Sequence, residues 1–386
     1  INNNNTQYAQ FNLKSINDKR YLLGKLSIVR KEMPDNRTGR RINYTGSNDS
    51  QTNAVSQSNE QNIKPAVELY GGFKLPSNQN LDLSLIGSYN RNEYTRRYSE
   101  GNFLSVTNAD EDFYNINISA NYAKQFQNKN TISAYFLDNY RSNQTKYTGN
   151  IDASQQLFTN EALLYIGYAH HFSSKFMLNT RLGLSWLKYE LKGENQVNQI
   201  SPRANSTIRY QISEKHRLSQ IAAIGNSFPT ANTLSNINQL IDSILIKRGN
   251  PGLDITKIYN GAIMYDMFSS KFNMQLMFIN NLYKDMMIAD YFPEEDKMIF
   301  YSHSNETIRQ HIGVISGTWN TAKNLFIKTE IALINTNFRG TVKDSHTTFR
   351  TTVDANYSWK NFMLNLFAKA KEKQLTNSYI YEQHYT

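Results

Sequence analysis

Residues 173–186 read Ser173-Ser174-Lys175-Phe176-Met177-Leu178-Asn179-Thr180-Arg181-Leu182-Gly183-Leu184-Ser185-Trp186, and they carry the clearest structural pattern in the chain. A polar turn comes first, and every second residue from Phe176 to Trp186 then lies on one largely apolar face, opposite Asn179 and Arg181. Alternation with a period of two predicts a β-strand with one apolar and one polar face. The apolar stripe is about as long as the 9–11 residues that a tilted strand needs to cross a bilayer.

The same alternation recurs along most of the chain. Further apolar stripes lie within 81–89, 116–122, 272–278, 325–333 and 349–359. The opposite faces carry charges of both signs, and we predict that these residues face a lumen: Asp82, Arg181, Arg209, Lys328, Glu330, Arg350 and Asp354. A hydrated lumen accommodates such charges, whereas a dry core would lose several kcal/mol for each unpaired one. A soluble β-sandwich also alternates, so alternation alone leaves both folds open.

Two kinds of connection separate the stripes. Tight polar turns lie at 76–80, 127–129, 173–175, 213–215, 269–271, 320–323 and 360–361, and longer polar connections at about 98–111, 148–160, 192–201, 226–255, 291–296 and 340–346. Outer-membrane barrels have short periplasmic turns and longer extracellular loops. Together with the stripe length, this asymmetry favours an antiparallel transmembrane β-barrel, integral to a bacterial outer membrane and in contact with its lipid.

The pattern predicts about fifteen strands, one near 20–31 followed by seven hairpins, whereas single-chain bacterial barrels have even counts. The start Ile1-Asn2-Asn3-Asn4-Asn5 resembles neither a signal segment nor a mature start. We therefore expect residues 1–386 to be a single partial barrel domain, incomplete at both ends, from a barrel of about 22 strands. A signal peptide and the last strands would lie outside it.

Composition excludes several classes of protein. The chain has no cysteine, which rules out a disulfide framework, a thiolate metal site and a cysteine nucleophile. Its net charge of +10 is scattered through turns, loops and strand ends, whereas a nucleic-acid-binding face needs clustered basic residues. Its 25 Tyr and 20 Phe suit strands whose ends sit at a membrane interface.

One segment resembles a known family. The residues Ile224-Gly225-Asn226-Ser227-Phe228-Pro229 precede a long connection, and Arg248-Gly249-Asn250-Pro251-Gly252-Leu253 lead into the next strand. This arrangement resembles the barrel of TonB-dependent outer-membrane receptors, most closely the Bacteroidota branch with the outer-membrane-protein β-barrel domain. The sequence departs from that family at Asp254-Ile255-Thr256, where Lys-Pro-Glu is common.

The resemblance implies energy-coupled uptake of a scarce ligand, which could be a glycan, a peptide or a metal chelate. It also implies a plug domain upstream in the same chain and the TonB energy-transducing complex as a partner, and it leaves a surface lipoprotein open as a further partner. The alternatives are a passive porin, a barrel that anchors a surface assembly and, more remotely, an outer-membrane enzyme.

The connection at 226–255 carries apolar residues at helical spacing: Leu234, Ile237, Leu240, Ile241, Ile244 and Leu245. This spacing predicts a short helix, capped by Thr233 or Ser235, that packs on neighbouring loops or forms a lid. The candidate ligand-binding residues all lie on the predicted external connections: Phe103, Phe228, Leu234, Asn250, Tyr291 and Phe292.

No pattern indicates catalysis, a cofactor or a metal. His170 and His171 are adjacent, so on a strand they point to opposite faces and do not converge on one ion. The acidic runs 110–112 and 294–296 could bind a hard cation, but solvated loop tips are the simpler interpretation. No phosphate-binding glycine loop or nucleophile elbow occurs. We expect a protein that is not an enzyme.

Overall fold

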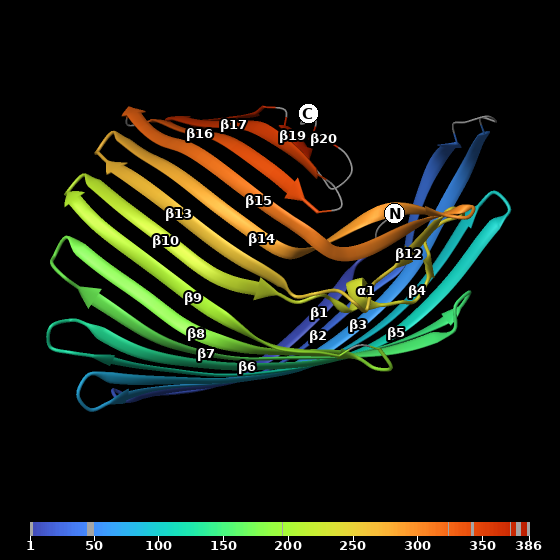
Figure 1. Cartoon of the computed structure of the whole chain (residues 1–386), viewed down its shortest axis with the longest axis horizontal. Coiled ribbons are helices and arrows are strands. Elements are labelled where there is room, and N and C mark those ends of the chain that lie inside the picture. Colours follow the sequence, from blue (N-terminus) through green and yellow to red (C-terminus); the bar gives the residue numbers. More distant parts are fainter. Residues whose placement is uncertain are drawn as a thin grey trace.

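The computed structural model describes residues 3–44, 50–194, 196–322, 324–340, 343–370, 372–375 and 380–383. Among these residues one 18-stranded sheet dominates, and two of its members, β11 and β12, are short strands of a connecting loop. The other sixteen form a continuous curved wall (Figure 1). They are β1 (Asn5–Ile16), β2 (Arg20–Tyr44), β3 (Ser50–Leu75), β4 (Gln79–Glu100), β5 (Phe103–Gln125), β6 (Thr131–Gly149), β7 (Ala153–His171), β8 (Phe176–Leu191), β9 (Gln196–Ser213), β10 (His216–Ser227), β13 (Thr256–Phe268), β14 (Phe272–Glu294), β15 (Lys297–Ala322), β16 (Leu325–Arg339), β17 (Lys343–Trp359) and β18 (Phe362–Lys369). A separate pair, β19 (Glu372–Leu375) and β20 (Ile380–Gln383), follows.

Each wall strand pairs antiparallel with the strand before and after it, and β10 pairs directly with β13 across the intervening loop. The predicted antiparallel barrel fold is confirmed, although the sheet is not closed between β1 and β18 within the described residues. No helix in the described part of the chain is long and apolar enough to cross a membrane.

The predicted strand count is slightly too low because it does not include β1. The alternating Ala9, Phe11 and Leu13 of this strand are masked by the asparagine-rich residues around them, yet all twelve of its residues pair with β2. An odd count therefore does not describe the wall as the structure has it. That further strands lie outside residues 1–386 stays a prediction.

The turns that the sequence predicts to be tight gather at one end of the wall, the left end in Figure 1, which we call the tight-turn end. The turn between β3 and β4 illustrates the chemistry, since Ser77 and Asn78 adopt φ values of 61° and 55°. Two successive left-handed residues form the primed turn that matches the twist of a β-hairpin. The predicted tight connections lie where they were expected; Lys323 of the turn at 320–323 lies outside the described residues.

The opposite end, which we call the extended end, differs from the prediction. The connections predicted at 98–111, 148–160, 192–201 and 291–296 are largely strand: β4 continues to Glu100 and β5 begins at Phe103, for example. At 340–346 the strands end at Arg339 and resume at Lys343, and residues 341 and 342 lie outside the described part. Polar residues suggest loops. Beyond the apolar stripe, however, a strand is held by hydrogen bonds to the backbones of its neighbours, so both of its faces can be polar. Of these six connections, 226–255 alone is a long excursion in the described chain.

The two faces of the wall differ as alternation requires. On the outer face Leu182 is 62% exposed, and Leu184 and Ile331 are exposed there as well. The residues predicted to face the lumen lie on the opposite face of the wall, and that this face lines a lumen stays a prediction. There Arg350 forms an ion pair with Glu330 at 3.3 Å, Lys328 stands opposite Asp354, and the Arg181 side chain lies over Gly167. Asp82 accepts a hydrogen bond from Asn121, and Arg209 pairs with Met177 of β8.

Interruptions in the ladder mark where two of the strands leave the regular wall. In β2 the pairing shifts between Met33 and Asn36, and in β14 it shifts between Tyr283 and Met286 and again before Ile288. Asp35 and Asp285 adopt left-handed backbone conformations there, with φ of 51° and 54°. Such bulges bend a strand and increase its twist.

Candidate functional site

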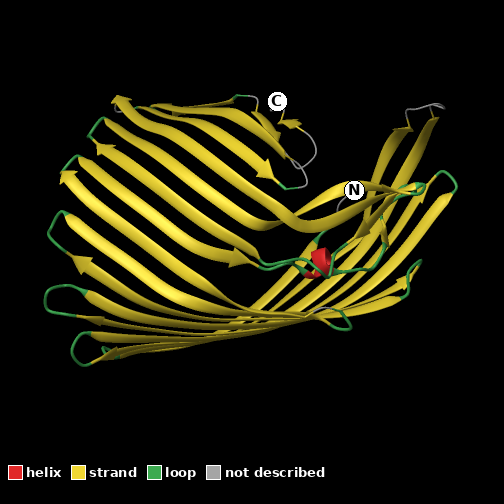
Figure 2. Cartoon of the chain, in the orientation of Figure 1, coloured by secondary structure: helices red, strands yellow, loops and turns green. Residues whose placement is uncertain are grey.

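One long segment crosses the opening at the extended end. This crossing loop, residues 228–255, contains α1 (Ala231–Leu234), β11 (Gln239–Leu240) and β12 (Leu245–Arg248). Figure 2 shows the helix on the concave side of the wall. The two arms of the loop meet at its base, where the Gly249 amide donates to the Ser235 carbonyl at 2.6 Å and the Asn250 amide donates to that of Thr233 at 2.7 Å.

The predicted helix is mostly wrong. Only four residues are helical, and the residue before them is Thr230 rather than Thr233 or Ser235. Leu240 and Leu245 instead belong to two short paired strands, and Ile241 and Ile244 lie in the turn that joins them. A short isolated helix is costly to nucleate, and pairing of β12 with a neighbouring strand satisfies the same backbone groups.

The base of the loop is buried in an apolar cluster against β7 and β8. We call this part, residues 228–235 and 249–255, the stem. Three buried stem residues, Leu234, Leu253 and Ile255, pack with buried residues of the wall. These are Leu157 of β7 and Leu187, Tyr189 and Leu191 of β8. The Tyr189 hydroxyl donates to the Leu253 carbonyl, and burial raises the pKa of Tyr189 to about 12. Tyr189 lies beyond the apolar stripe that ends at Trp186, outside the membrane-spanning part of β8.

The second attachment is a backbone ladder to β15. Residues of β12 pair in parallel with β15 from Leu245 opposite Met298 to Arg248 opposite Tyr301. The Arg248 guanidinium donates to both carboxylate oxygens of Glu294, at 3.0 and 3.3 Å. Bidentate contacts of this kind fix orientation as well as adding energy.

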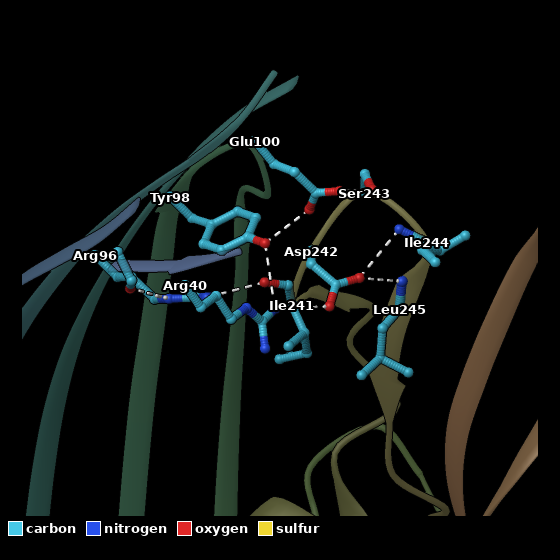
Figure 3. A network of polar contacts seen from close by, with 10 residues as sticks. Arg40, Arg96, Tyr98, Glu100, Ile241, Asp242, Ser243, Ile244 and Leu245 are labelled. Carbon is cyan, nitrogen blue, oxygen red and sulfur yellow. Dashed lines mark hydrogen bonds and ion pairs between the residues drawn. The ribbon is translucent and has the colours of Figure 1, made fainter. Parts of the chain in front are cut away.

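The third attachment lies at the far tip of the loop, residues 241–243, which meets the inner face of β2 and β4 (Figure 3). Arg96 donates to the Ile241 carbonyl at 2.9 Å, and the Ser243 hydroxyl donates to Glu100 at 2.8 Å. We call these contacts, together with the Arg40–Asp242 ion pair at 3.3 Å, the latch.

Two latch residues are held in place by further contacts. The Tyr98 hydroxyl donates to Glu100 at 2.7 Å and accepts from Arg40 at 3.2 Å. Asp242 also closes its own turn, because its second carboxylate oxygen accepts from the amides of Ile244 and Leu245 at 3.1 and 2.8 Å. The tip is therefore a preformed turn that presents one carboxylate oxygen to β2.

A cavity of about 400 Å³ lies between the start of the crossing loop and the inner faces of β5, β6 and β7. Polar and charged side chains dominate its strand side: Glu111, Asn139, Arg141, Asn143, Thr159 and Glu161. Phe113, Leu157, Phe228 and Pro229 supply an apolar side. Glu161 is paired with Arg203, and Asn143 donates to Glu111.

The structure brings some of the predicted ligand-binding residues together. Phe228 lines the cavity, Leu234 is fully buried in the stem, and Asn250 closes the stem by accepting from the Gly252 amide at 2.8 Å. Phe103 lies beside the latch, with its ring edge-on to Tyr98 at 6.3 Å.

Tyr291 and Phe292 lie apart from these residues, on the outer part of β14. They pair with aromatic rings of β15, since Tyr291 lies 5.1 Å from Phe300 and Phe292 lies 6.4 Å from Tyr301. Their strands hold β12, so they belong to the support of the loop rather than to the cavity. Whether any of the predicted residues binds a ligand stays a prediction.

No local sequence pattern indicates the latch or most of the cavity. The latch joins residues 143 to 202 positions apart, and periodicity along one segment carries no information about such a pairing. For the cavity the sequence gives a partial signal. Glu111 lies in the acidic run 110–112, which stands out in the sequence but is more simply interpreted as a solvated loop tip. Within the described residues no group of three or more His, Asp or Glu side chains could hold a metal ion.

No protein-family model and no curated protein matches this chain. Solved structures do. The copper transporter OprC superposes with a TM-score of 0.64 at 8% identity, over 96% of this chain and 66% of that one. The ferric-catecholate import receptor Fiu from K12 E. coli gives 0.59 at 9% identity, over 94% and 69% of the two chains. The pyoverdine outer-membrane receptor FpvA from Pseudomonas aeruginosa PAO1 gives 0.58 at 8% identity, over 98% and 68%.

The chain thus spans about two thirds of the length of these proteins, which are transport receptors rather than enzymes. At such low identity the likeness concerns the fold, and the Bacteroidota branch of the resemblance stays a prediction. The sixteen-stranded antiparallel wall, its apolar outer face and these structural neighbours all indicate the same barrel fold. The chain has the barrel fold of TonB-dependent outer-membrane receptors.

Proposed function

We propose that the chain forms the barrel of a receptor that takes up a scarce ligand across the outer membrane, with the extended end outside. The observation that supports this most is the crossing loop, which is attached at three places across the opening and stands over a polar cavity. A passive porin works through an unobstructed pore, so such a loop favours a receptor over a porin.

The charges that line the cavity favour a glycan or a peptide over a strongly anionic ligand. Glu161 is neutralised by Arg203, which leaves Glu111 and Arg141 as opposite charges among the amides of Asn139 and Asn143. A site of this kind suits a ligand that both donates and accepts hydrogen bonds, and Phe228 can cover an apolar face of it. A glycan or a peptide fits this description better than a strongly anionic metal chelate, which would need an excess of positive charge.

The remaining partners are part of the same proposal. Energy coupling through the TonB complex, and a plug domain in the same polypeptide, are supported by the likeness to receptors of that type. A surface lipoprotein would be a further partner at the extended end. A signal peptide and additional strands outside residues 1–386 also belong to the proposal.

Excising the outer half of the crossing loop tests the proposal. Residues 236–248 can be replaced by a short glycine linker, because Ser235 and Gly249 are already hydrogen-bonded neighbours and the buried stem is kept. In cells that depend on the full-length receptor for growth on its glycan or peptide, we expect saturable uptake to be lost. The barrel should remain heat-modifiable on a gel, since loops tolerate change better than the ladder does.

The matched control is a small insertion at Ser174, in a turn of the tight-turn end. Uptake that survives the excision but fails on the insertion would show that the two ends are assigned the wrong way round. Full retention of uptake in both variants, with unchanged single-channel conductance in a planar bilayer, would argue against any role of the loop in transport.

A further inference from the structure

The stem, the ladder to β15 and the latch differ in how easily they can be undone. The stem is buried among apolar side chains, and β12 is held by a backbone ladder. The latch consists of hydrogen bonds and an ion pair with side chains of β2 and β4; Arg40 is 59% exposed there, whereas Asp242 is 16% exposed and Glu100 is buried. Exposed ion pairs contribute little and are screened by salt.

We propose that the crossing loop is a gate that opens at the latch, while its stem and its ladder to β15 stay in place. This inference rests on the proposed receptor function, since it assigns a mode of access to the cavity beneath the loop. Opening separates the tip, residues 241–243, from Arg40, Arg96 and Glu100.

The tip is built to leave and return without refolding. Asp242 holds its own turn through the amides of Ile244 and Leu245, and these bonds do not involve β2 or β4. Breaking the latch therefore leaves the turn formed, with its other carboxylate oxygen still aimed at Arg40. A preformed tip loses little conformational entropy on rebinding, which favours repeated opening and closing.

Two strands that support the crossing loop, β2 at the latch and β14 beside β15, carry an interruption in their pairing. In β2 the ladder shifts between Met33 and Asn36, a few residues before Arg40. In β14 the ladder shifts twice between Tyr283 and Ile288. The next residues of β14 pair with the part of β15 that holds β12. Both supports of the gate thus bend at a bulge, where fewer ladder bonds resist displacement.

The chain provides a position that can report opening directly. Ala54 of β3 is only 2% exposed, and it stands opposite Arg40 of β2 and Glu100 of β4 in the ladder. Directly opposed residues share a face, so Ala54 lies between the two latch strands on the side that receives the tip. Because residues 1–386 contain no cysteine, the substitution Ala54→Cys introduces their sole thiol, which we call the latch thiol.

The experiment measures how fast a charged methanethiosulfonate reagent labels the latch thiol in the full-length receptor, with no ligand needed. Raising the salt concentration should accelerate labelling. Asp242→Asn keeps a side-chain oxygen that can accept from the amides of Ile244 and Leu245, but it removes the charge that faces Arg40. We expect it to accelerate labelling about two- to fivefold at low salt, the range that exposed ion pairs allow.

Two controls locate the movement. Glu194→Gln makes the same kind of chemical change at the Asn236 contact, away from the latch, and should leave labelling of the latch thiol unchanged. A separate Leu234→Cys variant carries a stem thiol instead, and its labelling should stay slow in high salt and with Asp242→Asn. Heat-modifiability confirms that each variant forms a barrel.

Two outcomes overturn the gate. Equal acceleration at the latch thiol and the stem thiol would mean that the loop leaves as one body. Labelling of the latch thiol that ignores both salt and Asp242→Asn would mean that charge does not hold the latch. Neither result depends on uptake, so a failure of the gate is distinguishable from a failure of the receptor function, which the loop excision tests.

Discussion

The crossing loop is held at its stem by buried apolar side chains and at its tip by polar side-chain contacts, of which the Arg40–Asp242 ion pair is exposed on the arginine side. Leu234 and Leu253 of the stem are 0% and 1% exposed, whereas Arg40 at the tip is mostly exposed. Burial of apolar surface is worth about 1.5–3 kcal/mol for each such side chain, while an exposed ion pair contributes about 0–1 kcal/mol. One segment thus combines a permanent attachment with a reversible one.

The largest effect is expected at the stem. Leu234→Ala removes a fully buried side chain and leaves a cavity, which costs about 2–5 kcal/mol. The Gly249 and Asn250 amides, which bond across the stem, should then lose protection in hydrogen exchange. Leu240→Ala, at a half-buried position in β11, is the control. Similar losses in both variants would remove the distinction between stem and hairpin.

A smaller effect is expected from the buried hydroxyl of the stem. Tyr189→Phe leaves the Leu253 carbonyl without this donor, at a cost of about 1–3 kcal/mol. The folded-state pKa of about 12 exceeds the ordinary value of 10, so folding favours the protonated hydroxyl. Its contribution is complete below pH 10 and is lost as the pH rises from 10 to 12.

Two measurements check this expectation. Ultraviolet titration of wild type minus Tyr189→Phe should show one tyrosine that ionises near pH 12. Hydrogen exchange started after brief incubation at high pH should show loosening of the stem in wild type, with a weaker pH dependence in the variant. A difference titration centred at pH 10, the ordinary value, would place this hydroxyl in solvent.

At the latch, Arg96→Ala should have an effect of about 1 kcal/mol, the usual worth of one net hydrogen bond. Arg96 donates to the Ile241 carbonyl and lies 4.9 Å from the Tyr98 ring centre. Labelling of the latch thiol should rise about fivefold, the equivalent of that free energy, while the stem stays protected. Arg91→Ala is the matched control, because Arg91 is an exposed residue of the same strand that pairs with Glu93. Equal labelling in the two variants would show that the tip does not depend on Arg96.

The smallest effect is expected from Arg40→Met, which keeps much of the length of the side chain but removes its charge. At low salt the loss should be about 0.2–1 kcal/mol, and it should vanish at high salt because the ion pair with Asp242 is already screened there. The salt dependence of latch-thiol labelling measures this directly. A variant that remains as salt-sensitive as the wild type would assign the effect to other charges.

Local alternation is enough to predict the wall. Residues 176–186 form a strand with Leu182 and Leu184 exposed on the outer face, and the turn at 173–175 lies where it is expected. The prediction of strand ends fails where it relies on polar composition and not on alternation. Polar stretches such as 98–111 suggest loops, although the residues from Arg96 to Glu100 keep pairing with β5.

The candidate site is only partly predictable, for a different reason. The position of the long connection and the role of Phe228 in a cavity wall follow from one segment of sequence. Leu234, a predicted ligand contact, lies in an apolar cluster because residues of β7 and β8 close over it, and whether it contacts a ligand stays a prediction. Contacts such as Ser243 with Glu100 depend on the curvature of the whole wall, which no local pattern contains.

The neighbour-by-neighbour pairing of the wall has a consequence for how the protein assembles. Hairpins form between residues close in sequence, whereas the Arg40–Asp242 contact closes a chain loop of about 200 residues, so the entropy of closing it must be met first. We therefore expect the strands to zip up in order and the crossing loop to dock last. During biogenesis the barrel would pass through a stage in which its wall is inserted but its passage is still uncovered.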